Sequence, residues 1–430
     1  MAGLNARGVG NPPCPTALVL TGGGARGAYE VGVLDFLYET LVEKGPRKGL
    51  FDIFSGTSAG ALNACTLGSV AHDPPNGYKA LTAYWRSITM ERLLKFGARE
   101  VARLPNLVLG RRLGLDALQV RKRPKQRVGP PHPPVVGLFD TSPLYQDMIR
   151  QIPWHFLQEN VQKGILRGIA VCATELCTSR SIVFYQVHEP GMYRPGRDSA
   201  KEERPVRMSV HHAMASAAMP FLFPAVQIDG LCFVDGGLRQ NAPLYPALRM
   251  GAEKVLIVGL SREPDLKYRI ARLSCQKNPY PGSLFLLGRT VRTIMDGVLD
   301  HEVHRIEMFN ELIRKGQERY GESFLENLNA DTRPYRNTDY RRIDVRVIRP
   351  SRDLNEVALE AIEEAPDELG MPGLSGRLLK NVMTSSPLLE SELSSLLMFT
   401  PTYIRKLIQL GYEDARQRRE EMSEFLAAEG

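Results

Sequence analysis

The sequence predicts an α/β fold, a three-layer α/β/α core around a mainly parallel sheet. Two short and largely apolar runs, residues 17–20 and 51–54, have the length of buried strands. Each run leads into a glycine-containing turn and then into a helical pattern. Because repetition of strand, glycine turn and helix is typical of parallel sheets covered by helices, we expect this architecture here.

The helices and further strands follow in order along the chain. A helix with an apolar stripe is expected from Ala28 to about Glu43, and a helix rich in small residues from Ala61 to about Leu67. The same texture later predicts helices at 142–152 and about 206–218, and strands at 169–172, 182–185, 231–234 and 255–258. We expect 255–258 to be the last core strand, because mostly helical patterns follow it, including a charged helix at 403–425.

Length and composition limit the class of protein and its division into domains. Of the 430 residues, 43% are hydrophobic and 24% charged, which excludes wholesale disorder and a fibrous repeat. The length allows two to four domains or one large domain with insertions. The patterns predict a flexible tail at 1–16, an α/β domain at 17–260 with an inserted basic segment at 85–135, and a mostly helical C-terminal extension at 261–430.

Cysteine usage and apolar runs bear on the compartment. Six cysteines without a C-x-x-C pair favour reduced thiols over a disulfide scaffold. Residues 1–16 lack the apolar core of a secretory signal, and apolar runs such as 255–258 and 396–399 are far shorter than the ~20 residues of a membrane span. We therefore expect a cytoplasmic protein whose contact with a membrane, if it has one, is peripheral.

A first candidate site is the pentapeptide Gly56-Thr57-Ser58-Ala59-Gly60, which matches the G-x-S-x-G pattern. It lies where a predicted strand turns into a helix, the setting in which a serine nucleophile needs glycines for a cramped turn. The start of the following helix also favours developing negative charge. The pentapeptide alone is weak evidence, so a structural turn stays open as the alternative.

A second candidate is the glycine-rich run that follows the first strand and opens a helix, Gly22, Gly23, Gly24, Ala25, Arg26 and Gly27. As G-x-G-x-x-G, its backbone N–H groups could hold a dinucleotide pyrophosphate. As an oxyanion hole, the same groups would face a tetrahedral intermediate. In a dinucleotide-binding fold, the second strand would end at an acidic residue that contacts a ribose. Here the second strand ends at the G-x-S-x-G turn, which favours the oxyanion interpretation. A glycine turn without a ligand stays open.

The third requirement is a base. No histidine stands in a position typical of one, and His301 and His304 lie in a helical pattern one residue short of zinc-helix spacing, so no metal site is expected. Asp235 ends an apolar strand and precedes Gly236 and Gly237. Desolvation at the edge of a core can raise the pKa of such a carboxylate toward that of a useful base. Taken alone, these residues also fit an ordinary Asp-Gly turn.

The three motifs, in this order and spacing, resemble the patatin-like phospholipase family. Its pattern combines a G-x-G-x-[RK]-G loop, a G-x-S-x-G elbow and a distant D-G-[GA], which here are residues 22–27, 56–60 and 235–237. Two supporting stretches also look like the family, at 139–144 and 215–224. The resemblance covers about residues 17–260 and gives the C-terminal region no role.

The resemblance implies a Ser–Asp dyad in place of a triad, which would account for the missing histidine. Ser58 would attack a (phospho)lipid carboxylic ester with Asp235 as general base, and the backbone of Gly22–Gly24 would hold the oxyanion. Water would then release the acyl-enzyme. Arg26 would steady the loop or meet an anionic head group. The family pattern requires no metal or cofactor, and we expect none.

Two other classes of function stay open. The chain could be a nucleotide-binding module that uses residues 22–27, or a non-catalytic lipid-binding or scaffold protein on the same fold. Intact Ser58 and Asp235 speak against the second of these. The acyl acceptor, the lipid head group and the oligomeric state are not set by any of these motifs.

The net charge of +7 has one source. Residues 86–127 hold twelve Lys or Arg against three acidic residues, mixed with aliphatic side chains. This mixture suits the surface of an anionic bilayer, so we expect a cap that docks on acidic lipid, with a solvated basic loop as the alternative. Nucleic acid is not an expected partner, because no aromatic platform accompanies the charge.

Overall fold

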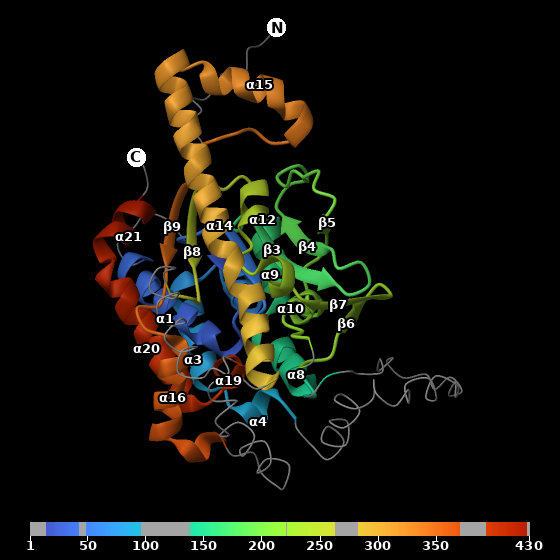
Figure 1. Cartoon of the computed structure of the whole chain (residues 1–430), viewed down its shortest axis with the longest axis vertical. Coiled ribbons are helices and arrows are strands. Elements are labelled where there is room, and N and C mark those ends of the chain that lie inside the picture. Colours follow the sequence, from blue (N-terminus) through green and yellow to red (C-terminus); the bar gives the residue numbers. More distant parts are fainter. Residues whose placement is uncertain are drawn as a thin grey trace.

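The computed structural model describes residues 14–42, 49–95, 137, 139–220, 222–262, 283–369 and 393–427. A nine-stranded sheet forms the centre, with the strand order β5-β4-β3-β2-β1-β8-β9, and β7 pairs with both β3 and β6 (Figure 1). Its strands are β1 (Thr16–Leu20), β2 (Ile53–Thr57), β3 (Gly168–Glu175), β4 (Ser181–Val187), β5 (Lys201–Pro205), β6 (Val226–Ile228), β7 (Leu231–Asp235), β8 (Lys254–Val258) and β9 (Asp344–Ile348).

Most of these strand pairs are parallel. β1 lies between β2 and β8 and is parallel to both, β2 continues in parallel to β3, and β8 to β9. The antiparallel pairs are β3 with β4, β3 with β7, and β6 with β7. The predicted α/β class with a mainly parallel sheet is therefore confirmed.

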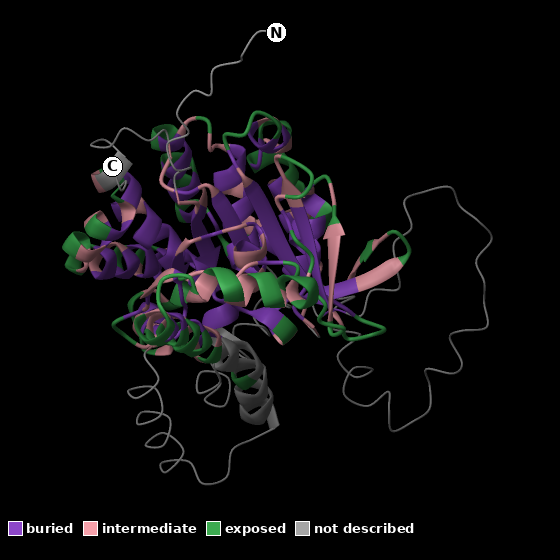
Figure 2. Ribbon diagram, turned by 90° about the horizontal axis from the view of Figure 1, so that it is seen from above, coloured by how far each residue is buried: buried purple, intermediate pink, exposed green. Residues whose placement is uncertain are grey.

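Side chains of the central strands enter two separate cores, one on each face of the sheet. In β1, Leu18 and Leu20 belong to one core and Ala17 and Val19 to the other, as the two-residue period of a strand requires. Figure 2 shows the sheet as buried throughout its centre. The predicted three-layer arrangement follows, because both faces are covered.

Helices of unequal number cover the two faces. The larger core contains side chains of α1 (Gly27–Leu37), α2 (Ala59–Ser69), α3 (Pro74–Arg86), α4 (Met90–Leu93), α8 (Ser142–Gln151), α9 (Trp154–Gln162), α10 (Val210–Ser216), α16 (Leu354–Glu364), α19 (Leu393–Leu397), α20 (Pro401–Gln417) and α21 (Arg419–Leu426). The smaller core contains side chains of α12 (Leu244–Arg249) and α14 (Ser283–Tyr320). The remaining elements are η1 (Gly24–Arg26), η2 (Tyr38–Val42), α11 (Gly237–Gln240), α15 (Phe324–Arg336) and η3 (Pro366–Leu369).

The structure corrects two expectations about the C-terminal region, which contributes a strand to the central sheet. Residues 255–258 are not the last core strand, because β9 pairs with β8 from Lys254↔Asp344 to Val258↔Ile348. The half-exposed, charged sequence DVRVI hides this strand from a search for apolar runs, because β9 is an edge strand. The region is mostly helical as expected, but the helix predicted at 403–425 is two helices, α20 and α21. A domain boundary at 260 stays a prediction.

The α20 helix packs against α1 at very short range. A Cβ atom on Gly32 of α1 would collide with the carbonyl of Ile408, and one on Gly411 of α20 would collide with the carbonyl of Tyr29. The Tyr29 hydroxyl also donates to Asp414 Oδ2 at 3.0 Å. The C-terminal helix is thus fixed against the helix that follows the glycine-rich loop (Figure 1).

Some predicted boundaries shift and some regions lie outside the described residues. The strand β1 begins at Thr16, inside the predicted tail, and β2 begins two residues later than expected. The helix expected at 206–218 is confined to α10. Of the basic segment at 85–135, only the first residues, in α3 and α4, are described, so the predicted cap lies mostly outside the described chain.

Among the helices of the described ranges, none combines the length and apolar character that crossing a membrane requires.

The crossing of α1 and α20 yields a test of the fold. Gly411→Ala should lower the free energy of unfolding by about 1–3 kcal/mol, because the added methyl group has to displace the α1 backbone. Chemical denaturation measures the change. Gly49→Ala is the matched control, because a Cβ there meets only Pro74 at 3.9 Å. Equal effects of the two substitutions would contradict the close packing.

Candidate active site

Ser58 occupies a strained turn between β2 and α2. Its φ of 54° and ψ of −124° are unusual for a residue with a side chain, and it is 3% exposed. The flanking glycines make the turn possible, because a Cβ on Gly56 would collide with the Gly60 carbonyl and one on Gly60 would lie 2.5 Å from the Leu20 carbonyl oxygen. The predicted strand–turn–helix setting of the G-x-S-x-G motif is confirmed.

The register of β3 brings Ser58 and Asp235 together from distant parts of the chain. The last residue of β2, Thr57, pairs with Cys172, and the last residue of β7, Asp235, pairs with the next residue, Ala173. Since β4 occupies the other edge of β3, β2 and β7 lie on the same side and run toward each other. Their ends therefore meet, and so do the two side chains.

The backbone around this junction is held by Ser216 of α10. The Ser58 N–H donates to Ser216 Oγ at 2.9 Å, and that hydroxyl donates to the Cys172 carbonyl at 2.5 Å. A side chain on Gly236 would collide with the same Cys172 carbonyl. Sequence reasoning assigned Gly236 to the motif but gave Ser216 no role, although Ser216 lies in the supporting stretch 215–224.

Asp235 is a buried carboxylate with one free oxygen. Its side chain is 2% exposed, and Oδ1 accepts the Gly237 N–H at 2.7 Å. Oδ2 has no hydrogen-bond partner of ordinary geometry within the described chain. Burial raises the pKa of Asp235 to about 6, although the nearby Ser58 hydroxyl and the Gly237 N–H act to lower it. A carboxylate with this pKa can take up a proton near neutral pH.

The glycine-rich loop lies against Ser58, because a Cβ on Gly22 would be 2.9 Å from Ser58 Cβ. The expectation that Gly22 serves as an oxyanion donor is not supported, since its N–H already donates to Asn241 Oδ1 at 3.0 Å. The N–H groups of Gly23 and Gly24 make no hydrogen bond to the described residues. Gly24 has φ +56° and lines the pocket together with Ser58. Gly23 and Gly24 are therefore two free donors that this loop offers beside the pocket.

The other predicted site residues have packing and positioning contacts. Ala25 is fully buried in η1, and a Cβ on Gly27 would lie 2.8 Å from Ala59 Cβ. The Thr57 hydroxyl donates to the Gln240 carbonyl at 2.9 Å, and Ala59 lines the pocket.

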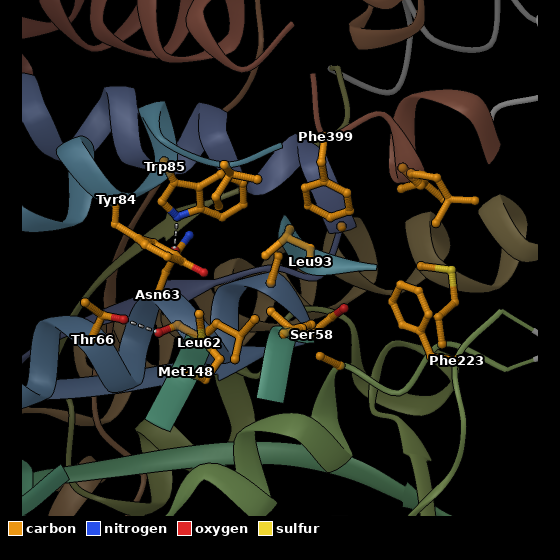
Figure 3. A pocket seen from close by; sticks show the side chains of 18 residues that line it. Ser58, Leu62, Asn63, Thr66, Tyr84, Trp85, Leu93, Met148, Phe223 and Phe399 are labelled. Carbon is orange, nitrogen blue, oxygen red and sulfur yellow. Dashed lines mark hydrogen bonds between the residues drawn. The ribbon is translucent and has the colours of Figure 1, made fainter. Parts of the chain in front are cut away.

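An apolar pocket opens beside Ser58 (Figure 3). Its empty volume is about 610 Å³, which includes space open to solvent. The lining contains no charged side chain among the described residues. Besides Ser58 it comprises Gly24, Ala59, Leu62, Asn63, Thr66, Tyr84, Trp85, Ile88, Leu93, Leu144, Met148, Ala217, Met219, Phe223, Leu396, Leu397 and Phe399.

A buried polar network lies behind the pocket wall. The Trp85 Nε1–H donates to Asn63 Oδ1 at 2.8 Å, and Asn63 Nδ2 donates to Glu30 Oε2 at 2.9 Å. Glu30 is fully buried, and this burial raises the pKa of its carboxyl well above the usual range. Sequence reasoning did not identify this network, because Glu30 lies within an otherwise apolar helix pattern.

Arg26 connects the glycine-rich loop to the C-terminal region. Its side chain is 5% exposed and donates to Ser395 Oγ from Nε at 3.0 Å and from Nη2 at 2.6 Å, and to Asn355 Oδ1 at 3.0 Å. Ser395 Oγ in turn donates to Asn355 at 2.7 Å. Of its two expected roles, Arg26 thus has the contacts of a residue that steadies the loop. Its burial does not fit contact with a head group.

The C-terminal region also forms part of the pocket wall, which sequence reasoning missed. Leu396, Leu397 and Phe399 line the pocket, and the Leu396 carbonyl fills the space above Gly24. The apolar run 396–399 was the available signal, but nothing local to it indicates which surface it covers.

Histidines and metal-type clusters are absent from this part of the described chain. No histidine lines the pocket, and His212 accepts the Ser209 N–H at 3.1 Å as part of the N-terminal cap of α10. No group of three or more His, Cys, Asp or Glu side chains suited to a metal occurs among the described residues. The five described cysteines form no disulfide.

A buried serine on a strand-to-helix turn, with a buried aspartate at the end of the facing strand, is an arrangement typical of α/β serine hydrolases. Comparison with family models identifies the particular family. The model described as Patatin-like phospholipase matches residues 18–248, more than half of the chain. The chain therefore belongs to the patatin-like phospholipase family, as the motifs predicted.

Individual relatives are more distant. A cGAMP-activated phospholipase from Pseudomonas aeruginosa is 30% identical over 232 residues, which are 54% of this chain and 55% of that protein. The chain thus spans about half the length of this curated relative. The crystal structure of VipD from Legionella pneumophila is similar over 94% of this chain and 92% of VipD, with 13% identity and a TM-score of 0.28. Human GIVD cytosolic phospholipase A2, in complex with methyl gamma-linolenyl fluorophosphonate, is similar over 96% of this chain and 59% of that chain, with 12% identity and a TM-score of 0.36.

The raised pKa of Asp235 predicts that Asp235→Asn stabilises the protein, and does so more at high pH than at low pH. A folded-state pKa of about 6, above the unfolded value of about 3.9, means that protonation favours the folded state and that this contribution is lost as the pH rises through 6. At pH 8 the buried carboxylate costs up to about 3 kcal/mol, which Asp235→Asn removes. The difference in unfolding free energy between Asp235→Asn and wild type should shrink from pH 8 to pH 5. A difference independent of pH would contradict this assignment, and Ser199→Ala, at an exposed serine, serves as the control.

The contacts of Arg26 predict local loosening when its guanidinium is replaced. Arg26→Lys cannot reproduce the fork to Ser395 and Asn355, so amide hydrogen exchange should accelerate in both 22–27 and 393–400. Mass spectrometry of the exchanged peptides measures this. Arg180→Lys, at a half-exposed ion pair with Glu202, is the control and should leave both peptides unchanged. Protection that changes in neither peptide would show that the contacts do not hold the loop.

Proposed function

We propose that the protein is a lipid acyl hydrolase that cleaves (phospho)lipid carboxylic esters through a Ser58–Asp235 dyad. The observation that carries the proposal is the meeting of a strained, buried serine with a buried carboxylate of raised pKa beside an apolar pocket. Family membership supports the same class of reaction.

In the first step, Ser58 Oγ attacks the ester carbonyl carbon and its proton passes to Asp235. The tetrahedral intermediate collapses to an acyl-enzyme when the ester C–O bond breaks, and the leaving alcohol takes the proton from Asp235. In the second step, water attacks the carbonyl carbon of the acyl-enzyme and Asp235 accepts a proton from it. The bond between this carbon and Ser58 Oγ then breaks, Asp235 returns the proton to Ser58 Oγ, and the carboxylic acid is released. No histidine is needed, because a base of pKa about 6 is mostly ionised at pH 7 and still takes up a proton readily.

The developing oxyanion is stabilised by Gly23 and Gly24 in this proposal. Both N–H groups are free of partners within the described residues, and Gly24 shares the pocket with Ser58. Preformed backbone donors of this kind typically contribute ~10²–10³ in rate each. Arg26 acts through the loop as a positioning residue.

The substrate class follows from the chemistry of the pocket. Hydrocarbon suits a lining of Leu, Ile, Met, Phe and Trp side chains, whereas a dinucleotide pyrophosphate does not. The curated relative is a phospholipase, which supports a phospholipid as substrate. We also propose that residues 86–127 contact an anionic membrane. This part of the proposal rests only on their net positive charge.

Covalent labelling tests the dyad. A fluorophosphonate probe should label wild type but not Ser58→Ala, whose kcat/KM for esters should fall by at least about 10³-fold. Asp235→Asn should label slowly and lose about 10²–10⁴-fold in kcat/KM, because its amide cannot accept the proton. Ser199→Ala, at an exposed serine, is the matched control.

Two outcomes would overturn the proposal. One is full labelling and turnover by Ser58→Ala. The other is a wild type that is inert to the probe and to esters but is stabilised against heat by NAD(P) or ATP, which would favour a nucleotide site at 22–27.

A further inference from the structure

We propose that the part of the pocket that follows α2 from Ser58 to Thr66 binds the acyl chain, and that Thr66 and Tyr84 set its maximum length. This inference rests on the proposed hydrolase function. It deepens that function by assigning the residues that determine chain-length specificity.

The α2 helix gives this part of the pocket its direction. Ala59, Leu62 and Thr66 recur at helical spacing on one face of α2 and all line the pocket. The eight steps along the chain from Ser58 to Thr66 correspond to a rise of about 12 Å along the helix. Figure 3 shows Leu62 between Ser58 and Thr66, with Tyr84 at the same far end. A chain attached to Ser58 can therefore extend along α2 to that end.

The facing wall is deeply buried and apolar. Trp85 is 4% exposed, Ile88 and Leu93 are 2% exposed, and Met148 is 1% exposed. The polar groups of the α2 wall are already engaged, since the Thr66 hydroxyl donates to the Leu62 carbonyl at 2.8 Å. A wall of this composition favours hydrocarbon over polar groups of a substrate.

The pocket also extends to the other side of Ser58. Phe223 lies on that side in Figure 3, and Phe223, Leu397 and Phe399 are each 9% exposed. We assign this side to the alcohol part of the ester, which has to leave. The channel along α2, where Trp85 and Met148 are 4% and 1% exposed, then remains for the acyl chain.

The far end is formed by Thr66 and by the partly exposed Tyr84, which contacts a charged side chain. Arg92 pairs with Asp147 at 2.9 Å, and its guanidinium carbon lies 5.4 Å from the centre of the Tyr84 ring. Burial and the nearby Asp147 raise the pKa of Tyr84. Because moving Tyr84 would lose its contact with the Arg92 guanidinium, the wall should resist a chain that is too long.

The test is the acyl-length profile of kcat/KM for p-nitrophenyl esters from butyryl through octanoyl to palmitoyl. Thr66→Leu and Thr66→Phe fill the end of the channel progressively. We expect the longest accepted chain to shorten in that order, with kcat/KM beyond the new limit falling about ten-fold or more relative to the butyryl ester. The graded pair keeps the test valid if the larger side chain prevents folding, and labelling by a short-chain fluorophosphonate reports a competent Ser58.

Controls separate this inference from general damage. Ala83→Phe adds the same ring at an exposed position of α3 beside Tyr84, and it should keep the wild-type profile. Equal losses at every chain length in both Thr66 variants, or an unchanged profile in both, would overturn the inference. A longer limit in Phe223→Ala, with no change in the Thr66 variants, would place the acyl chain on the other side and also overturn it.

The proposed function fails separately. If wild type shows Ser58-dependent turnover but the Thr66 variants keep its acyl-length profile, only this inference is overturned. If wild type hydrolyses no ester of any length, both the proposed function and this inference are overturned.

Discussion

The edge of β3 at Cys172 and Ala173 is the constraint on which the rest of the site depends. It pairs with the end of β2 on one residue and the end of β7 on the next, so two strands that run in opposite directions meet there. The Cys172 carbonyl also accepts the Ser216 hydroxyl and leaves no room for a side chain at Gly236. The positions of Ser58 and Asp235 are thus set by backbone hydrogen bonds, which are less adaptable than side-chain contacts.

This arrangement costs stability, which the remainder of the fold has to supply. Ser58 has a positive φ, and both Asp235 Oδ2 and Glu30 Oε1 are buried without an ordinary hydrogen-bond partner in the described chain. Strain and unpaired polar atoms of this kind each cost about 1–3 kcal/mol. A sheet buried on both faces and the close crossing of α1 with α20 are the features that offset these costs.

The C-terminal region contacts the elements that carry the motifs at several places. It adds β9 to the sheet, packs α20 on α1, binds Arg26 through Ser395 and Asn355, and supplies part of the pocket wall. The family match ends at residue 248, before all of these contributions. In this chain the region beyond the shared motifs therefore shapes both the glycine-rich loop and the space beside Ser58.

The sequence by itself determined the α/β class, the strand–turn–helix setting of Ser58, the strand end at Asp235 and the family, because these depend on local patterns of apolar residues and glycines. Only the tertiary structure decided which N–H groups of the glycine-rich loop are free. The Gly22 N–H is not free because it donates to Asn241, which lies more than two hundred residues away in the sequence. It also decided where β9 pairs and what Leu396 covers. An edge strand and an apolar loop carry no local mark of their partners, so their places are fixed by contacts between segments far apart in the chain.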